Sequence, residues 1–386
     1  MIERAYLDWN ASAPLRSRAR EAMLAALDQC GNASSVHAEG RAARQSIERA
    51  RTQLAALAGT DPDQIIFTSG ATEANVLALS PGWARKAGDA PVERLLVSAV
   101  EHPSVREGGR FPRDQIETIP VDRQGVIDRD ALRRLLGGAP ALVSVMLANN
   151  ETGVVQPVSE VAELVREAGG LLHVDGVQAP GRVSFDFNVL GCDLLTLSSH
   201  KIGGPKGAGA LIRRDGLHLS DPLIRGGGQE RGLRAGTENV AAIAGFGAAA
   251  EQVRESLAAE IAHARRLRDR LEADLRHHTP DVIVFGEEAE RLPNTTLFSH
   301  PGLRAETAVI GFDLAGVAVS SGSACSSGKV QLSHVLAAMG VEPALARGAI
   351  RVSTGPLTTD TDLERFLSAW IKLSESLLKG RKVIAA

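Results

Sequence analysis

The chain has 386 residues, in which 43 lysine and arginine residues nearly balance 46 aspartate and glutamate residues. This length exceeds the size at which a single hydrophobic core keeps growing, so we expect two domains, or a large and a small lobe. The charges are balanced and scattered, which excludes an electrostatic footprint for nucleic acid or a membrane surface and leaves a small-molecule substrate as the expectation.

Short apolar runs rich in β-forming residues alternate with helical patterns along most of the chain. Amphipathic helices such as 130–136 and 158–168 separate predicted strands at residues 64–68, 95–99, 142–147, 171–174, 193–198 and 209–212. This βαβ rhythm is typical of a parallel sheet that is covered by helices on both faces. The predicted fold class is therefore α/β.

The pattern changes in the last third of the chain. A long helical stretch leads to two short strands and a closing helix, at residues 240–277, 281–285, 295–298 and 360–378. We therefore predict a large domain of residues 15–245. A smaller α+β domain is expected to consist of residues 1–14 and 246–386 and to carry a mobile cysteine loop at about residues 320–332.

Two residues at strand ends carry the strongest functional signal, because ligands of parallel sheets bind beyond the carboxyl ends of the strands. Lys201 follows the strand at 193–198, and Asp175 follows the strand at 171–174. A lysine can form a Schiff base with pyridoxal phosphate (PLP), and a carboxylate can keep its pyridine nitrogen protonated. Alone, each residue is more simply a turn lysine or a helix N-cap, but their combination predicts a PLP site.

Residues at other strand ends suit the same cofactor. The segment 68–73 joins a strand to a helix through glycine, so Ala71 and the Thr72 hydroxyl lie at the positive end of a helix, which favours phosphate. His102 could stack on the pyridine ring and exchange protons with the substrate. An ordinary helix cap and a surface or core histidine are the alternatives for these positions.

Polar residues near Lys201 and Asp175 complete the pattern. Asn150 and Gln178 could donate hydrogen bonds to the phenolic oxygen of the ring, and Ser198 and His200 flank Lys201 and could bind phosphate. Asparagine-rich and hydroxyl-rich turns are also common for conformational reasons. The PLP prediction therefore depends on the convergence of these residues.

A run of serine and glycine at residues 320–329 surrounds Cys325. A structural cysteine normally lies among apolar residues, whereas this segment cannot pack and is expected to be mobile and accessible. We interpret Cys325 as a nucleophile on a flexible arm, with an incidental exposed cysteine as the alternative. Cys30 and Cys192 lack such a setting and are assigned to structure.

Arg351 follows a short apolar run near the end of the chain. Its guanidinium could hold a substrate carboxylate through a bidentate pair. A surface arginine is the simpler explanation of this residue when it is taken alone.

Other function classes lack their motifs. The GxGxxA match at residues 245–250 lies inside a helical stretch, and neither the P-loop pattern nor HExxH occurs, so ATP hydrolysis and zinc proteolysis are not supported. The cysteines form no CxxC pair, and no metal site is predicted. The N-terminus opens on charge, and the longest uncharged apolar stretch, 240–250, is far shorter than a bilayer span, so a cytoplasmic protein is expected.

Together these segments resemble the NifS/IscS-type cysteine desulfurases, which belong to the class V aminotransferase group of PLP fold type I. The resemblance covers nearly the whole chain and is carried by residues 6–8, 68–73, 101–102, 149–151, 173–178, 199–201, 225–231 and 320–325. It implies a large domain with a mainly parallel seven-stranded sheet covered by helices, and a smaller α+β domain.

The resemblance also implies a role for each candidate residue. Lys201 is the Schiff-base lysine, Asp175 the partner of the ring nitrogen, His102 the stacking acid and base, and Cys325 the acceptor of sulfur. The cofactor is further bound by Ala71, Thr72, Asn150, Gln178, Ser198, His200 and, across a subunit interface, Thr237. The substrate is bound by Asn32, Asn150 and Arg351.

The implied reaction removes sulfur from L-cysteine and gives L-alanine and a persulfide on Cys325, for iron–sulfur cluster assembly or other sulfur-containing products. We expect a homodimer that passes sulfur to an acceptor such as an iron–sulfur scaffold protein. Residues 234–239 look more like the nitrogenase-associated NifS branch than the housekeeping branch.

Two alternatives stay open. A selenocysteine lyase or another class V aminotransferase would not need Cys325, and a product assay for alanine and sulfide against keto acid distinguishes it. A non-enzymatic sulfur carrier or scaffold would be colourless and would not respond to added PLP.

Overall fold

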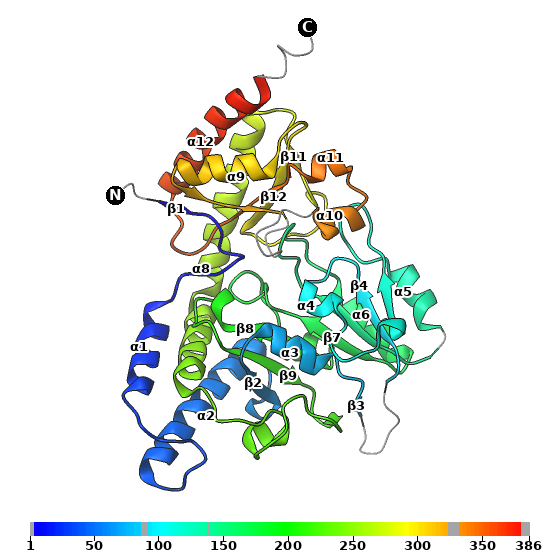
Figure 1. Ribbon diagram of the computed structural model, residues 1–386, viewed down its shortest axis with the longest axis vertical. Coiled ribbons are helices and arrows are strands. Elements are labelled where there is room, and N and C mark those ends of the chain that lie inside the picture. The colour runs from blue at the N-terminus through cyan, green and yellow to red at the C-terminus, as the bar shows by residue number, and fades with distance from the viewer. Residues whose placement is uncertain (1–3, 86–91, 138, 323–331, 380–386) are drawn as a thin grey trace.

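The computed structural model describes residues 4–85, 92–137, 139–322 and 332–379. Within these residues, seven strands form the larger sheet, in the order β2-β9-β8-β7-β6-β4-β5 (Figure 1). Strand β9 is antiparallel to both of its neighbours, and the other strands run parallel. The prediction of an α/β fold with a mainly parallel seven-stranded sheet is confirmed. The strands are β2 (Ile65–Thr68), β4 (Leu95–Ser98), β5 (Ile116–Ile119), β6 (Leu142–Met146), β7 (Leu171–Asp175), β8 (Leu194–Ser198) and β9 (Gly209–Arg213).

Strand β5 is the one strand of this sheet that the sequence pattern does not predict. It lies at the sheet edge, where it pairs only with β4 among the described strands. Glu117 and Thr118 remain partly or fully exposed there. Because an edge strand does not need to be apolar on both faces, it lacks the continuous hydrophobic run that marks the central strands.

Side chains of successive strand residues face two hydrophobic cores on opposite sides of the sheet. Leu172 and Val174 of β7 belong to one core, and Leu171 belongs to the other, which also contains residues of α3 (Ala71–Ala78). Because side chains alternate along a strand, Asp175 lies on the same face as Leu171 and therefore toward α3.

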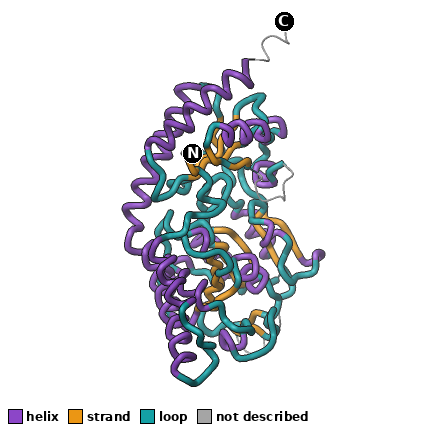
Figure 2. The backbone as a smooth tube through the Cα atoms, turned by 60° about the vertical axis from the view of Figure 1, so that its left-hand side comes forward, coloured by secondary structure: helices purple, strands orange, loops and turns teal. Residues whose placement is uncertain are grey.

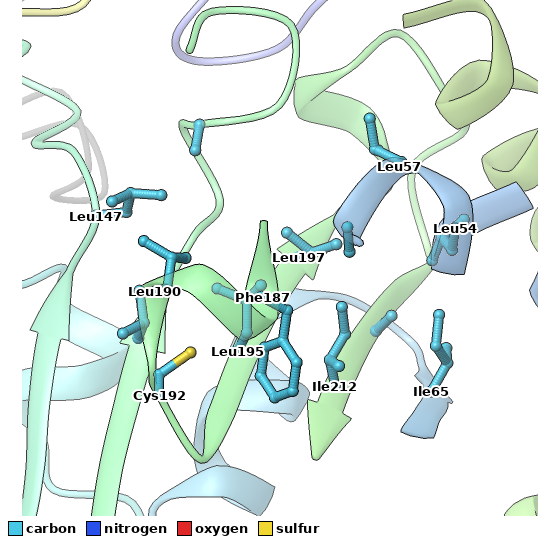
Figure 3. Close-up of a cluster of buried hydrophobic side chains, with 14 of the residues drawn as sticks. Leu54, Leu57, Ile65, Leu147, Phe187, Leu190, Cys192, Leu195, Leu197 and Ile212 are labelled. Atoms are coloured by element: carbon cyan, nitrogen blue, oxygen red, sulfur yellow. The ribbon is translucent and has the colours of Figure 1, made fainter. Parts of the chain in front are cut away.

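The core on the opposite face of the sheet from α3 contains Cys192, beside Leu195 and Phe187 (Figure 3). Cys192 is fully buried, and burial raises the pKa of its thiol above the ordinary range. Cys30 is exposed. It lies after the end of helix α1 (Ser17–Leu27). Because its side chain is exposed, burial does not support the prediction that Cys30 has a structural role.

Helix α8 (Val240–His278) has 39 residues and is about 58 Å long at 1.5 Å per residue. Its first turns, including Phe246, pack in the core of the large sheet, and its last turns, including Leu271, pack in a separate core. Figure 2 shows this helix along one side of the molecule. The expected domain boundary at 245/246 falls inside α8, and the division into domains stays a prediction.

The second sheet has four described strands in the order β11-β12-β15-β14, all antiparallel to their neighbours. Its core includes an aromatic cluster in which Phe298 lies edge-on to Trp370 and Phe312 stacks on Phe366. Strand β12 contributes Phe298, helix α9 contributes Phe312, and helix α12 contributes the other two aromatic side chains. The elements are β11 (Ile283–Val284), β12 (Thr295–Ser299), β14 (Ser320–Ser321), β15 (Ile350–Ser353), α9 (Ala305–Leu314) and α12 (Asp360–Lys379).

The N-terminal segment connects the two sheets. Strand β1 (Ala5–Tyr6) pairs with β13 (Val317–Ala318), and the Trp9 N–H donates to the Ser353 carbonyl of β15. Four residues later, the Ala13 N–H donates to the His200 carbonyl beside the larger sheet. Residues 9–13 therefore lie between β15 and the carboxyl end of β8.

Helices α1 and α2 (Ala38–Ala58) pack on α8, and shorter elements complete the described fold. No helix among the described residues has the length and apolar character needed to cross a membrane. The remaining α-helices and strands are α4 (Pro103–Arg106), α5 (Arg129–Leu136), α6 (Val158–Glu167), α7 (Phe187–Leu190), α10 (His334–Ala338), α11 (Pro343–Ala346), β3 (Trp83–Ala84) and β10 (His218–Leu219).

Candidate active site

A cavity of about 560 Å³ opens at the carboxyl ends of the parallel strands, where the α/β fold predicts a ligand. Residues from the larger sheet, the N-terminal segment and β15 line it. The sequence-predicted residues in its wall are Ala71, Thr72, His102, Asn150, Asp175, Gln178, Ser198, His200, Lys201 and Arg351.

Lys201 reaches the cavity from the short 3-10 turn Ser199–Lys201, which follows β8. Its Nζ donates to the carbonyl oxygens of Asn10 at 2.6 Å and Ala11 at 3.0 Å. Gly203, with φ of 80°, allows the backbone just after Lys201 to pass close to the N-terminal segment, since a Cβ there would lie 2.9 Å from the Pro14 carbonyl oxygen. The amine is therefore held by the N-terminal segment.

Asp175 is the last residue of β7 and is almost fully buried. Its Oδ2 accepts a hydrogen bond from Asn75 Nδ2 at 3.0 Å, and its Oδ1 accepts one from the Val177 N–H at 3.0 Å. Both donors are neutral, so the carboxylate keeps its charge available for a cationic ligand group in the cavity.

Two histidines border the cavity with lowered pKa values. Burial lowers the pKa of His102, the positive charge of Lys201 adds to this shift, and Asp175 opposes it. Burial also lowers the pKa of His200 to about 4, with the charges of Lys201, Lys206 and Arg182 acting in the same direction. Both imidazoles are consequently neutral near pH 7.

Arg351 is buried and is not a surface arginine, which excludes the simpler explanation of this residue. It extends from β15 of the second sheet into the cavity wall. Its Nη2 donates to Asp8 Oδ1 at 2.7 Å, and its Nη1 donates to the Asn150 carbonyl oxygen at 2.9 Å. A guanidinium in the cavity wall can bind an anionic substrate group.

The residues present fit PLP. Gln178 Oε1, Asn75 Oδ1 and Arg351 Nε are buried and have no hydrogen-bond partner among the described residues, which is expected where a polar ligand supplies the partner. The first turn of α3 presents free N–H groups at its positive end next to the cavity. Gly209 of β9 allows this arrangement, since a Cβ there would lie 2.5 Å from the Gly70 carbonyl carbon.

Three predicted site residues are not in the cavity wall. Asn32 and Thr237 are exposed and line no part of this cavity in the same chain. Asn32 instead accepts the Ser34 N–H within its own turn. Cys325 lies outside the described residues. The roles of these three residues stay predictions.

Asn10, Asn75, Ser104 and Lys206 line the cavity without having been predicted as ligands. Asn75 follows Thr72 by three residues, so the helical period places both on the same side of α3. That spacing could have revealed Asn75 from the sequence. Asn10 offered no such signal, because its position depends on the pairing of β1 with β13.

Comparison with known proteins agrees with this geometry. The sequence model of the family described as Aminotransferase class-V matches residues 5–366. The chain belongs to the class V aminotransferase family. Enzymes of this family use PLP, which agrees with the fit of the cavity residues to that cofactor.

Individual members of the class V aminotransferase family are similar over nearly the full chain. A cysteine desulfurase of Gluconacetobacter diazotrophicus is 44% identical, with 94% of this chain and 91% of that protein covered. A cysteine desulfurase IscS of Dictyoglomus turgidum is 40% identical, with 98% and 96% covered. The X-ray structure of a NifS-like protein from Rickettsia africae has a TM-score of 0.88 at 35% identity, covering 97% of this chain and all of that one. The predicted resemblance to cysteine desulfurases is confirmed, and the preference for the NifS branch stays a prediction.

Glu151, next to Asn150, is a further buried acid near the site. Its Oε2 accepts a hydrogen bond from Ser333 Oγ at 2.6 Å, and Ser333 caps the N-terminus of α10. Burial raises the pKa of Glu151 from 4.5 to about 7, although the Ser333 hydrogen bond and the Arg351 charge oppose the shift. Between pH 4.5 and about 7, the folded protein therefore retains a proton on Glu151 that the unfolded chain releases.

We expect Glu151→Gln to change how stability depends on pH. Between pH 4.5 and about 7, the folded state binds one more proton than the unfolded state, so the wild-type free energy of unfolding falls as pH rises, by up to about 3 kcal/mol from this residue. Glutamine removes that contribution. Urea unfolding of both proteins across this range should show the variant gaining stability relative to wild type with rising pH, and a pH-independent difference would contradict the assignment.

Proposed function

We propose that this chain is a cysteine desulfurase that converts L-cysteine to L-alanine, with PLP as cofactor and Cys325 as the acceptor of the sulfur. The observation that carries the proposal is the convergence of the Lys201 amine, the Asp175 carboxylate and the Arg351 guanidinium on a single cavity wall. Relatives that are 40% and 44% identical and named cysteine desulfurases support it.

The residues that would hold PLP are distributed around the cavity. Lys201 would bind it covalently, Asp175 would pair with the ring nitrogen, and Thr72, at the start of α3, would bind the phosphate with Ser198 and His200. When bound, PLP supplies an electron sink that stabilises negative charge at the substrate carbon. The remaining chemistry comes from the side chains of this chain.

Each cavity residue has a defined task in the proposed reaction. Arg351 binds the substrate carboxylate and so fixes the orientation of cysteine relative to Lys201. The Lys201 Nζ accepts the α-proton of the substrate, and the carbonyl oxygens of Asn10 and Ala11 hold that amine in the cavity wall. His102 lies on the same wall and exchanges protons with the substrate.

The sulfur transfer balances without an external oxidant. The bond between Cβ and sulfur of L-cysteine breaks, a sulfur–sulfur bond forms at Cys325 Sγ, and the products are L-alanine and a Cys325 persulfide. We propose that the persulfide passes to an acceptor protein such as an iron–sulfur scaffold. A cytoplasmic location and membership of the NifS branch, which rests on residues 234–239, are further predictions of the sequence.

Lys201 is predicted to be the lysine that carries the cofactor. Purified protein should be yellow, and borohydride reduction should fix PLP on the Lys201 peptide, as read by mass spectrometry. Lys206 also lines the cavity and is the matched control. Lys201→Ala should abolish the labelling, Lys206→Ala should keep it, and a label on Lys206 in the wild type would contradict the assignment.

Cys325→Ala separates cofactor chemistry from sulfur transfer. Because Lys201 and Asp175 are intact, the variant should bind PLP and shift its absorption spectrum with L-cysteine, yet alanine and sulfide production should fall roughly a hundredfold or more. Cys30→Ala should stay near wild-type activity. Normal turnover without Cys325 would favour the selenocysteine lyase or aminotransferase alternative.

We also propose a homodimer with two shared active sites. Thr237 is exposed and follows the glycine-rich segment 226–236, much of which is also exposed. Glycines allow close approach of a partner backbone, and a twofold contact would complete two sites at once. The resemblance to fold type I enzymes, in which a residue of one subunit reaches the phosphate of the other, supports this arrangement.

Thr237→Ala is expected to weaken PLP binding by about tenfold, because one hydrogen bond to a charged phosphate is lost, while the protein stays dimeric. PLP release measured by absorbance, together with sedimentation, tests this. Thr307→Ala, an exposed threonine on α9, is the matched control and should leave PLP affinity unchanged. Sedimentation of the PLP-loaded wild type as a fully active monomer would refute the shared-site proposal.

A further inference from the structure

His102 has its two ring nitrogens in different environments. The Ser104 N–H donates to His102 Nδ1 at 3.2 Å, and the Ser104 hydroxyl lies 2.8 Å from the same nitrogen. A backbone N–H can only donate, so Nδ1 must be the acceptor. Nε2 makes no hydrogen bond to another residue in the described part of the chain.

Asn75 fixes the direction of the Ser104 hydroxyl. Asn75 Nδ2 donates to Ser104 Oγ at 2.9 Å and to Asp175 Oδ2 at 3.0 Å. The amide is fully buried and cannot be reversed, because its oxygen would then face the Asp175 carboxylate. Since Ser104 Oγ accepts from Asn75, its own hydrogen is available to donate to His102 Nδ1.

We propose that Asn75 and Ser104 are positioning residues that hold neutral His102 in the tautomer with its proton on Nε2. The chain of hydrogen bonds starts at the Asp175 carboxylate, passes through the Asn75 amide and the Ser104 hydroxyl, and ends at Nδ1. Each member lines the cavity. The inference deepens the proposed function, on which its catalytic meaning rests.

This tautomer limits what His102 can do. A neutral ring with its proton on Nε2 presents a hydrogen-bond donor at that nitrogen. Nε2 cannot accept a proton from the substrate while it carries its own. His102 therefore first acts as a hydrogen-bond donor or acid toward the substrate. The removal of the substrate α-proton is left to the Lys201 amine, on the same cavity wall.

The tautomer can be read directly by nuclear magnetic resonance of the PLP-loaded, ¹⁵N-labelled enzyme. Long-range ¹H–¹⁵N spectra distinguish a protonated ring nitrogen from an unprotonated one, and His102→Gln identifies the signals of His102. We expect unprotonated Nδ1 and protonated Nε2 in the wild type. A neutral His102 with its proton on Nδ1 would overturn the proposal, whether or not the enzyme proves to be a desulfurase.

Ser104→Ala tests the contribution of the hydroxyl and should lower the population of the Nε2-protonated tautomer. Its matched control is Ser144→Ala. Ser144 Oγ on β6 lies 2.8 Å from His173 Nδ1 on β7, so the pair has the same geometry, but neither residue lines the cavity. The control should move only the His173 signals. Unchanged His102 signals in Ser104→Ala would overturn the role assigned to the hydroxyl.

The pH titration of His102 gives a second readout. Donors at Nδ1 favour the neutral ring, so Ser104→Ala should move the titration midpoint of His102 upward. Asp175 on β7 and Lys201 after β8 act on the charge of the ring, and His334 on α10 interacts electrostatically with both His102 and Arg106 of α4. The variant retains all of these groups. A downward shift of the midpoint would contradict the proposed direction of the hydrogen bond.

Kinetics separate positioning from a merely structural role. If the proposed function holds, Ser104→Ala should lower kcat for alanine formation about fivefold and leave KM within about twofold, since Arg351 still binds the substrate. Asn75→Ala should produce the same change in the His102 tautomer. Should Asn75→Ala fail to fold, the wild-type spectrum and Ser104→Ala still decide the question.

Discussion

The hydrogen bonds from the Lys201 amine to the carbonyl oxygens of Asn10 and Ala11 are the constraint on which the site depends. They require the N-terminal segment to lie between the two sheets. The same Asn10 carbonyl also accepts from Gln178 Nε2 at 3.1 Å, so a single main-chain oxygen fixes two cavity side chains. An N-terminal segment in any other path would leave both donors without these partners.

Asn10 itself is held from the side of the second sheet. Its N–H donates to Ser353 Oγ, its Nδ2 donates to Thr295 Oγ1 and the Asn150 carbonyl oxygen, and its Oδ1 accepts from Asn294. All of its polar groups are paired although the residue is 1% exposed. Such a fully satisfied buried network favours one geometry over alternatives. The position of the Lys201 amine is therefore coupled to the second sheet.

The cavity combines cationic side chains with neutral imidazoles. Lys201, Lys206 and Arg351 give it the charge that phosphate and carboxylate groups require. Burial, together with the charges of Lys201, Lys206 and Arg182, keeps His200 uncharged. Asp175 is the acid in the wall that pairs with neutral donors, which leaves its charge for a cationic partner. The electrostatic arrangement thus separates a place for anions from a place for a protonated ring nitrogen.

The sequence alone predicts the parts of this site that depend on local patterns. Lys201, Asp175 and His102 lie at or after the carboxyl ends of central strands whose apolar runs are unmistakable, and parallel strands place these ends at a common edge. Thr72 follows from the glycine that joins β2 to α3. Strand β5 was not predictable, because an edge strand keeps polar residues and lacks the continuous apolar run.

Only the tertiary structure decided the remaining contacts. Arg351 looked like a surface arginine until the pairing of β15 with β12 and β14 buried it beside Asp8, which is 343 residues away. Asn10 and Asn75 gain their roles from residues that are distant in the chain, and no local period encodes such pairs. The sequence specifies strands and their ends through periodicity and apolarity, whereas hydrogen bonds between separate elements depend on packing geometry, which the linear pattern does not contain.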